Sequence, residues 1–181
     1  PLSNLDAYKG QKFRVMDSKI LQEQCAAVGA SAVSIAFGEL YTALQTGVVD
    51  GQENPLDTIA TMKYFEVQKN LVVTEHGVME DIVLFNPGWW KSLPANHQQI
   101  IARTFDEVRP DVEKNKEAAQ QVALETIRKA GTQVRVADEA ERRRLGQAMY
   151  ARSKAAYLER AGAEGQKLVA LYETEIKKAG N

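Results

Sequence analysis

The sequence predicts an α/β lobe followed by long helices. Between residues 11 and 90, short apolar runs alternate with amphipathic helical stretches, which indicates strands and helices with largely parallel strand pairing. From about residue 95 the apolar residues follow helical spacing only. The 181 residues suffice for one domain or two small lobes, and we divide them into residues 1–92, the α/β lobe, and residues 93–181, the helical part.

The first half of the α/β lobe is regular. KFRVMDS predicts a strand, and SKILQEQCAAVGA predicts a helix that ends at Gly29, since glycine readily takes the positive φ of a helix terminus. SAVSIAF is rich in β-branched and small residues and predicts a second strand. ELYTALQTG predicts a short helix that stops at Gly47, and VVDGQENP runs from strand into loop.

The second half of this lobe is predicted to contain one more helix and further strands. PLDTIATMKYFEVQK predicts a helix with a proline near its start. NLVVTEHGVMEDIVLFN predicts one or two strands.

The helical part begins with a predicted helix over residues 95–130 that ends at Gly131. At 1.5 Å per residue this helix would be ~54 Å long. That is too long for one small lobe, so it should cross between two bodies or leave the core. Pro110 should kink it. The remaining residues predict two helices around a break at Gly162–Gly165.

Charge and hydropathy exclude several classes of partner. The formal net charge of −1 gives no general attraction to nucleic acid or to anionic lipid, so no nucleic-acid partner is expected. No run of about 18 apolar residues occurs that could span a membrane. No signal peptide is visible, but the first residues resemble the middle of a protein, so a leader could precede Pro1.

Motifs for catalysis and metal binding are absent from the sequence. Cys25 is the single cysteine, and the two histidines, His76 and His97, lie far apart, so no metal and no cofactor is expected. Cys25 is expected to be a small buried side chain. The sequence contains no Walker loop, no GxGxxG pattern and no GxSxG elbow, so its motifs do not favour an enzyme.

Arg14 and the loop Gly51–Pro55 are the first candidates for ligand contacts. Arg14 lies in an apolar strand, where a guanidinium could hold a carboxylate with two parallel donors or could be a solvent-facing arginine. The loop follows a strand, the position at which open α/β sheets bind ligands. Its amides and its carboxylate could contact a ligand, or the loop could be a turn that caps a helix.

Aromatic residues and a histidine supply further candidates. Phe37 closes a predicted strand and could stack on a ligand or pack in the core. His76 lies at a strand end, where a structural hydrogen bond is the simpler role. Trp89 and Trp90 could line a cleft, and at least one is expected to anchor the long helix.

The order of these segments resembles that of a known family. KFRV, VGAS, AFGELYTALQTGVVDGQENP, KYFEVQK, TEH and NPGWWKSLP precede a long amphipathic helix. This arrangement is similar to the DctP-like extracytoplasmic solute-binding proteins of tripartite ATP-independent periplasmic (TRAP) transporters. ELYTALQTGVVDGQENP is the most specific part of the resemblance. The C-terminal helices share only their general helical pattern with the family. The resemblance implies a periplasmic-binding-protein-like fold of two α/β lobes with a long lobe-spanning helix, residues 1–92 forming a ligand-binding lobe.

The resemblance also implies a function and its residues. The protein would be a periplasmic receptor that binds an organic acid in the cleft between the lobes and delivers it to TRAP membrane subunits, without chemistry on the ligand. Arg14 would form a paired salt bridge with the ligand carboxylate, and Asn54, beside Glu53, would face the ligand. Phe37 would line the pocket, and His76 would belong to the polar network near it.

Family members are longer than this chain at their N-terminus. We therefore expect the N-terminal lobe to be largely missing and ligand binding by these residues alone to be weak or absent. The exposed apolar seam of such a lobe could be covered by a second copy in a homodimer.

Two other functions stay open beside the receptor. An α/β enzyme acting on small organic acids could use Asp50, Glu53 and His76 as acid–base groups. An interaction protein could instead be built from the helical second half of the chain.

Overall fold

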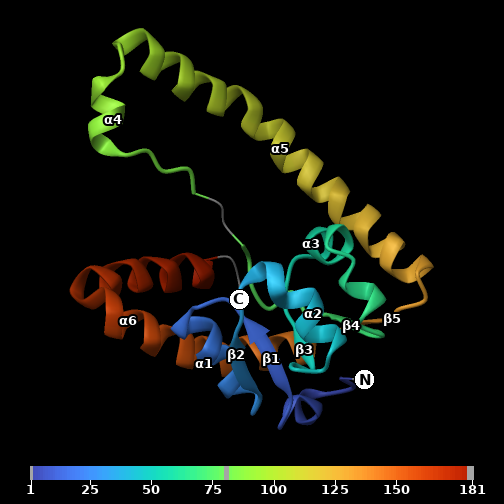
Figure 1. The fold of residues 1–181 in the computed structure, drawn as a ribbon. Helices are drawn as coiled ribbons and strands as arrows, with labels where there is room; N and C mark the ends of the chain where they lie inside the picture. The colour runs from blue at the N-terminus through green and yellow to red at the C-terminus, as the bar shows by residue number, and fades with distance from the viewer. Residues whose placement is uncertain (1, 80–81, 179–181) are drawn as a thin grey trace.

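The chain forms two small parallel sheets flanked by helices, and the computed structural model describes residues 2–79 and 82–178 (Figure 1). In the first sheet, β1 (Lys12–Val15) lies between β2 (Ser31–Ser34) and β3 (Gly51–Gln52). In the second sheet, β4 (Asn70–Val73) pairs with β5 (Gln133–Val136). All of these pairings are parallel, as the alternation of strands and helices predicts.

Helices connect the strands of the first sheet where the sequence predicts them. A short 3-10 turn, η1 (Leu5–Tyr8), precedes β1, and α1 (Lys19–Ala27) follows it. Gly29 ends α1 with a φ of +77°, a conformation that glycine adopts without strain. After β2 come the 3-10 turn η2 (Phe37–Glu39) and α2 (Leu40–Gln45). The α/β fold class is therefore confirmed.

The helix predicted after Pro55 is shorter than its sequence pattern. α3 (Leu56–Thr61) ends early because Lys63 adopts a left-handed conformation with φ +56°. The chain then forms a 3-10 turn, η3 (Tyr64–Glu66), which turns the Tyr64 side chain into the core. The prediction of a single helix over this segment was wrong, because the chain leaves the helix before Tyr64 and buries that side chain.

The segment after β4 is open chain up to α4 (Pro87–Ser92), as far as residues 74–79 and 82–86 describe it. One strand of the one or two predicted here is therefore present. The Asn86 side chain begins α4 by accepting hydrogen bonds from the backbone N–H groups of Gly88 and Trp89, at 2.9 and 3.1 Å.

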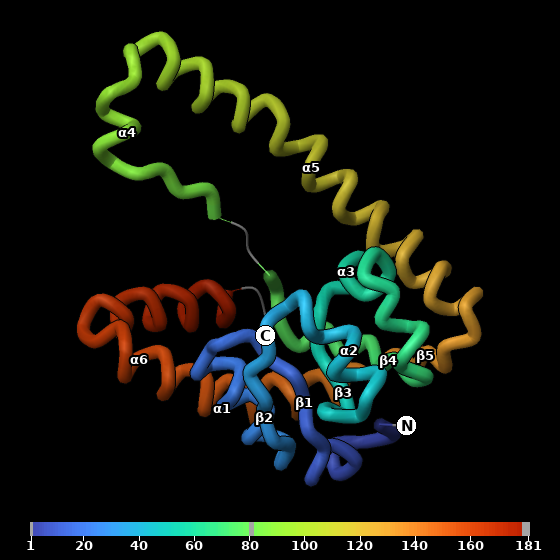
Figure 2. The backbone as a smooth tube through the Cα atoms, viewed as in Figure 1, coloured from blue at the N-terminus to red at the C-terminus, as the bar shows by residue number. Residues whose placement is uncertain are grey.

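The long predicted helix is present as α5 (Ala95–Lys129), 35 residues that continue through Pro110. Figures 1 and 2 show its first half projecting away from the sheets together with α4, while its last turns return to them. Near that end, the Asp57 carboxylate on α3 accepts hydrogen bonds from Lys116 and Gln120 at 2.6 and 3.0 Å. The expectation that this helix leaves the core is confirmed.

An aromatic cluster joins α4 to α5. The Phe85 ring stacks on Trp89 and Trp90, with centroids 5.5 and 4.9 Å apart, and meets the edge of Phe105 on α5 at 6.3 Å. Gln98 also donates to the carbonyl of Trp90. The tryptophan rings thus contact Phe85, which in turn contacts α5, and direct anchoring of the long helix by a tryptophan side chain stays a prediction.

The last helix, α6 (Glu139–Lys178), contains the predicted break. Gly162 has φ 57° and ψ −141°, so two helical segments meet there and the second folds back beside the first (Figure 2). The first segment packs against α1, where Arg152 pairs with Glu23 at 2.8 Å. Among the helices described, none is long and apolar enough to cross a membrane.

Two groups of buried side chains form the core. The first lies around α2, α3 and the end of α5 and includes Leu40, Tyr64 and Ile127, each 0% exposed. The second lies between η1, α1 and α6 and contains Tyr8 and Leu145. Because β5 pairs with β4, the second half of the chain completes a sheet begun in the first, and the division at residue 92 stays a prediction.

The projecting part of the molecule exposes many large apolar side chains, which we call the exposed apolar strip. It follows the open chain after β4 and continues along α4 and the first half of α5. Its members are Val78, Met79, Ile82, Val83, Leu84, Phe85, Trp89, Ile100, Phe105, Val108 and Val112.

Candidate ligand-binding site

Arg14 is buried, although it carries a charge. β1 alternates its side chains between the faces of the sheet, so Arg14 lies on the face opposite Phe13 and Val15. Only 3% of Arg14 is exposed, and its Nε donates a 2.8 Å hydrogen bond to the carbonyl of Ile35, just beyond β2. Within residues 2–79 and 82–178 the guanidinium makes no other hydrogen bond and no ion pair. Its Nη1 and Nη2 donors are therefore available to a ligand.

Phe37 covers this guanidinium. The Arg14 Cζ lies 5.8 Å from the centroid of the Phe37 ring, and that ring meets the edge of Tyr64 at 6.4 Å. Phe37 is 45% exposed, so it is not the core residue of the alternative interpretation. Its half-exposed ring thus offers an aromatic face beside the buried cation.

The loop after β3 brings an amide and a carboxylate to the end of the sheet. Gln52 pairs with Arg14 in the β1–β3 register, and its side-chain oxygen accepts a 2.5 Å hydrogen bond from Asn54 Nδ2. Pro55 then precedes the first residue of α3. The loop is therefore a connection into a helix, and it also places polar side chains at the carboxyl end of the strands.

Gly51 is required by the packing of this loop. A Cβ at this position would lie 2.8 Å from Cε1 of Phe13. The Phe13 ring stacks on Tyr8, with centroids 5.9 Å apart, so it has little freedom to retreat. The glycine lets β3 approach β1 closely and thereby sets the position of Glu53.

Glu53 and His76 are both held in partly dry surroundings. Burial raises the pKa of the Glu53 carboxyl, and the positive charge of Arg14 opposes that rise. Burial lowers the pKa of His76, whose Nδ1 lies 2.6 Å from the hydroxyl oxygen of Thr74. The neutral forms of both side chains are thus favoured relative to the same groups in water.

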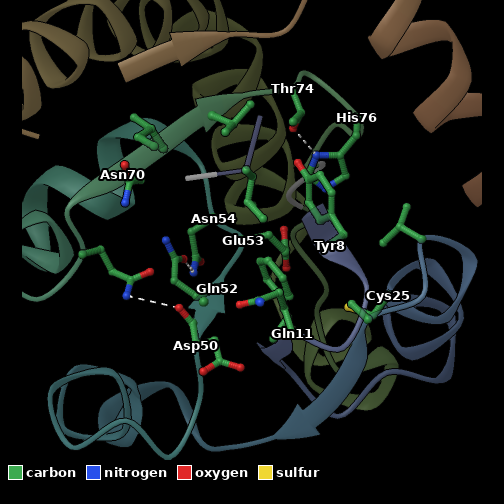
Figure 3. A pocket seen from close by; sticks show the side chains of 18 of the residues that line it. Tyr8, Gln11, Cys25, Asp50, Gln52, Glu53, Asn54, Asn70, Thr74 and His76 are labelled. Atoms are coloured by element: carbon green, nitrogen blue, oxygen red, sulfur yellow. Dashed lines mark hydrogen bonds between the residues drawn. The ribbon is translucent and has the colours of Figure 1, made fainter. Parts of the chain in front are cut away.

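A cavity of about 320 Å³ lies between the edge strands β3 and β4 and reaches α1 and α6. Figure 3 shows Glu53, Asn54 and His76 on its wall, together with Tyr8 and Cys25. Arg14 and Phe37 do not line this cavity. The predicted site residues thus fall into two groups: Arg14 with Phe37, and the three cavity residues, with Glu53 close enough to feel the charge of Arg14.

The cavity does not favour thiol or metal chemistry. Cys25 is half-buried rather than buried, and burial together with the nearby Glu53 charge raises its pKa to about 11, so the thiol stays protonated near neutral pH. Across the described part of the chain, no group of three or more potential ligands could hold a metal ion.

Sequence reasoning missed Tyr64 and the cavity wall formed by Tyr8. Tyr64 was read as part of a long helix, and only the left-handed residue before it turns its ring toward Phe37. Tyr8 belongs to a short 3-10 turn, which has no periodic signal in the sequence.

A buried cation with no ion pair among the described residues, near the end of a parallel sheet, is suited to bind a small anion. Comparison with known proteins identifies the family. Residues 1–160 match the model of the DctP family, described as bacterial extracellular solute-binding protein, family 7. The chain belongs to this family, and the resemblance found in the sequence is confirmed.

Several relatives are similar to the chain over much of its length. The sialic acid-binding periplasmic protein SiaP of Vibrio cholerae is 43% identical over 108 residues, which are 60% of this chain and 34% of SiaP. The C4-dicarboxylate-binding periplasmic protein DctP of Rhodobacter capsulatus is 37% identical over 132 residues, or 73% of this chain and 40% of that protein. The chain thus spans well under two thirds of these relatives.

Solved structures match the fold closely. A TRAP periplasmic solute-binding protein from Desulfovibrio salexigens, with bound orotic acid, is 62% identical to this chain and matches it with a TM-score of 0.94. The match covers 98% of this chain and 57% of the Desulfovibrio protein. One from Shewanella oneidensis, with bound succinate, is 32% identical with a TM-score of 0.82. That match covers 91% of this chain and 54% of the Shewanella protein.

Proposed function

We propose that this chain forms the carboxylate-binding part of a periplasmic receptor, which binds an organic acid and delivers it to TRAP membrane subunits. The buried Arg14 guanidinium is the observation that carries the proposal. Leaving its Nη1 and Nη2 without partners in a 3% exposed position is costly, because buried charges are normally paired. A carboxylate supplies two acceptors in the geometry that a guanidinium fits.

The other predicted residues would complete the site. Phe37 would pack its exposed ring against the acid. Arg14 would meanwhile bind the negative charge of the acid's carboxylate. Asn54 would contact the ligand with its amide. Glu53 would restrain Arg14 electrostatically, and His76 would hold the polar wall of the cavity through Thr74.

Relatives suggest which acids to test first. The solved structures named above contain orotic acid and succinate, and another, from Pseudomonas aeruginosa, contains L-malate. Orotate is the first choice, because the structure that contains it is 62% identical to this chain over the part that the two share. A planar ring with one carboxylate also suits a buried guanidinium beside an exposed aromatic face.

A thermal-shift screen with orotate, succinate, malate and galacturonate tests the proposal. At a concentration of about 100 Kd, a ligand that binds only the folded state adds about 2.7 kcal/mol of stability, enough for a shift of several degrees. The screen should use both the 181 residues alone and the complete gene product that carries them. No shift with any acid in the complete gene product would refute the proposed function.

Variants of Arg14 separate its charge from its shape. Arg14→Ala should weaken binding by about a hundredfold or more, since truncating one member of a buried hydrogen-bonded charge pair is strongly unfavourable. Arg14→Lys keeps the charge but loses the two-pronged donor, so it should bind well below wild type. Arg103→Ala on the exposed face of α5 is the matched control and should bind normally.

An enzyme acting on the same acids is the alternative function. Asp50, Glu53 and His76 all line the cavity, although Asp50 already accepts a 2.8 Å hydrogen bond from the backbone of Lys12. The family and its named relatives are solute receptors rather than enzymes. Prolonged incubation with each acid, followed by mass spectrometry, should return the acid unchanged.

The homodimer through the exposed seam of the truncated lobe also stays a prediction, and we assign that seam to the exposed apolar strip. The strip is the kind of surface that associates with another surface in water. Light scattering on the 181 residues alone should give twice the monomer mass if a second copy covers it.

A further inference from the structure

Gln52 lies between the two groups of predicted site residues. It is the last residue of β3 and pairs with Arg14 in the parallel register of β1 and β3. Paired residues of neighbouring strands point to the same face of a sheet, and such strands are about 4.8 Å apart. The Gln52 side chain therefore starts beside that of Arg14, on the same face of the sheet.

The Gln52 side chain also reaches the cavity. It lines the cavity together with Asn54, whereas Arg14 does not. Gln52 Oε1 accepts the 2.5 Å hydrogen bond from Asn54 Nδ2, and Figure 3 shows both amides on the cavity wall. Both side chains are half-buried, so they are open to a ligand that enters the cavity. Gln52 thus connects the Arg14 group to the cavity group through one hydrogen bond.

β3 holds Gln52 more firmly than the following loop holds Asn54. Just before the strand, Asp50 Oδ2 accepts a 2.8 Å hydrogen bond from the backbone N–H of Lys12, and the Asp50 N–H donates to the Lys12 carbonyl at 2.8 Å. Asn54 follows the strand, and in the part of the chain that the structure describes its side chain hydrogen-bonds to Gln52 alone. The orientation of the Asn54 amide therefore depends on Gln52.

We propose that Gln52 is the positioning residue that fixes the Asn54 amide beside Arg14 before the acid binds. The inference rests on the proposed function, in which Arg14 and Asn54 contact the same acid. With one N–H group of Nδ2 held by Gln52, Asn54 keeps its Oδ1 acceptor and a second N–H group for the ligand. A side chain that is already ordered loses less conformational freedom when the ligand binds, so affinity is higher.

A neutral amide suits this position better than a carboxylate does. Gln52 Oε1 supplies the acceptor that Asn54 needs without placing a full negative charge next to Arg14. A glutamate here would pair with the Arg14 guanidinium and compete with the carboxylate of the acid. The preference of the site for an acid therefore depends on residue 52 being uncharged.

The first test is Gln52→Leu in the complete gene product, measured by isothermal titration calorimetry with orotate, succinate and malate. The substitution keeps the approximate size of the side chain and removes the acceptor. We expect Kd for the acid that binds wild type best to rise about tenfold, the usual effect of one hydrogen bond. The melting temperature without ligand should stay near that of wild type, because the half-buried Asn54 amide can then bind water.

Gln24→Leu is the matched control. Gln24 lies on α1, lines the same cavity and is likewise half-buried, but it is not a strand neighbour of Arg14. The same chemical change there should leave Kd as in wild type.

A double variant shows whether Gln52 acts through Asn54. Asn54→Ala alone should weaken binding, and Gln52→Leu should then have little further effect in that background. If the two losses add in full, Gln52 does not act by positioning Asn54 and the inference is wrong.

Gln52→Glu is a second variant that keeps the acceptor for Asn54 and adds a negative charge beside Arg14. We expect Kd for the acid to rise about a hundredfold or more, since the new carboxylate occupies the guanidinium. The melting temperature without ligand should rise, because the buried Arg14 gains an ion pair. An acid affinity equal to that of wild type in Gln52→Glu would refute the placement of Gln52 beside Arg14.

Failure of this inference can be told apart from failure of the receptor function. Unchanged affinity in Gln52→Leu, with binding lost in Arg14→Ala, would overturn the role of Gln52 and leave the receptor function standing. Absence of binding to any acid by the wild-type complete gene product would overturn both.

Discussion

Replacing Gly51 with alanine should disturb the candidate site through packing alone. The new Cβ would lie 2.8 Å from Cε1 of Phe13 and 3.2 Å from both Cδ1 and Cζ, so one of the two strands must move. The Phe13 ring cannot turn away freely because it stacks on Tyr8. Overpacking of this kind costs about 1–3 kcal/mol. In a chain of this size, each kcal/mol lowers the melting temperature by about 2–4 °C.

The effect should extend to ligand binding. Glu53 lies two residues after Gly51, so a displaced β3 would also displace Glu53 and the loop that carries Asn54. We therefore expect Gly51→Ala to lower both the melting temperature and the affinity for orotate. Thermal melts and isothermal titration calorimetry on the same preparation measure the two effects.

Two further variants make this prediction specific. Gly38→Ala is the matched control, because no atom lies within 4 Å of its added Cβ. Phe13→Leu removes the ring that the new Cβ meets, so the double variant should be more stable than the sum of the single losses predicts. If Gly51→Ala melts at the same temperature as Gly38→Ala, the packing argument is wrong.

Three further predictions follow from the structure. The pKa of His76 is lowered by burial, so its contribution to stability is present above its ordinary value of 6.5 and lost as pH falls. His76→Gln should flatten the pH dependence of urea unfolding between pH 7 and 5, and an unchanged slope would refute this. Gly146→Ala, with open space at its Cβ, should stabilise α6 by about 0.5–1 kcal/mol, whereas Gly165→Ala, whose Cβ would lie 2.5 Å from that of Ala161, should destabilise it. Equal melting temperatures for the two variants would contradict that reasoning. Glu141→Gln should lower the free energy of unfolding by about 1–3 kcal/mol at pH 7, because it breaks a two-pronged ion pair with Arg135. The difference from wild type should become smaller well below pH 4.5, where Glu141 itself is protonated.

The sequence predicted the elements that rest on local signals. Gly29 and Gly131 end helices with positive φ, and Gly162 breaks the last helix, as their positions in the apolar pattern indicate. β5 was not predicted, because QVRV is only four residues long and lies between two long helices. Its strand state depends on pairing with β4, some sixty residues earlier in the chain, which no local pattern records.

The candidate site could be predicted by residue type but not by arrangement. Arg14 stands out in the sequence as a charge in an apolar strand, but whether it faces solvent or the interior depends on Phe37 and on the turn around Tyr64. The separation of Arg14 from the cavity that holds Asn54 and His76 follows from side-chain alternation across β1 and from the gap between β3 and β4. Both depend on tertiary packing.

Only the C-terminal half of α5 contacts the sheets and α3, while its first half projects from them, so α5 could move as a lever (Figure 1). Its fulcrum is the contact of Lys116 with Asp57, and Asp57 is only three residues beyond Asn54. From Lys116 back to Ala95 the helix is roughly 30 Å long. A rotation of about 10° at the fulcrum would swing the far end by roughly 5 Å, taking that length of helix as the radius. If an organic acid binds as proposed and α3 shifts around it, that shift would become a larger movement at the aromatic cluster of α4, far from the acid itself.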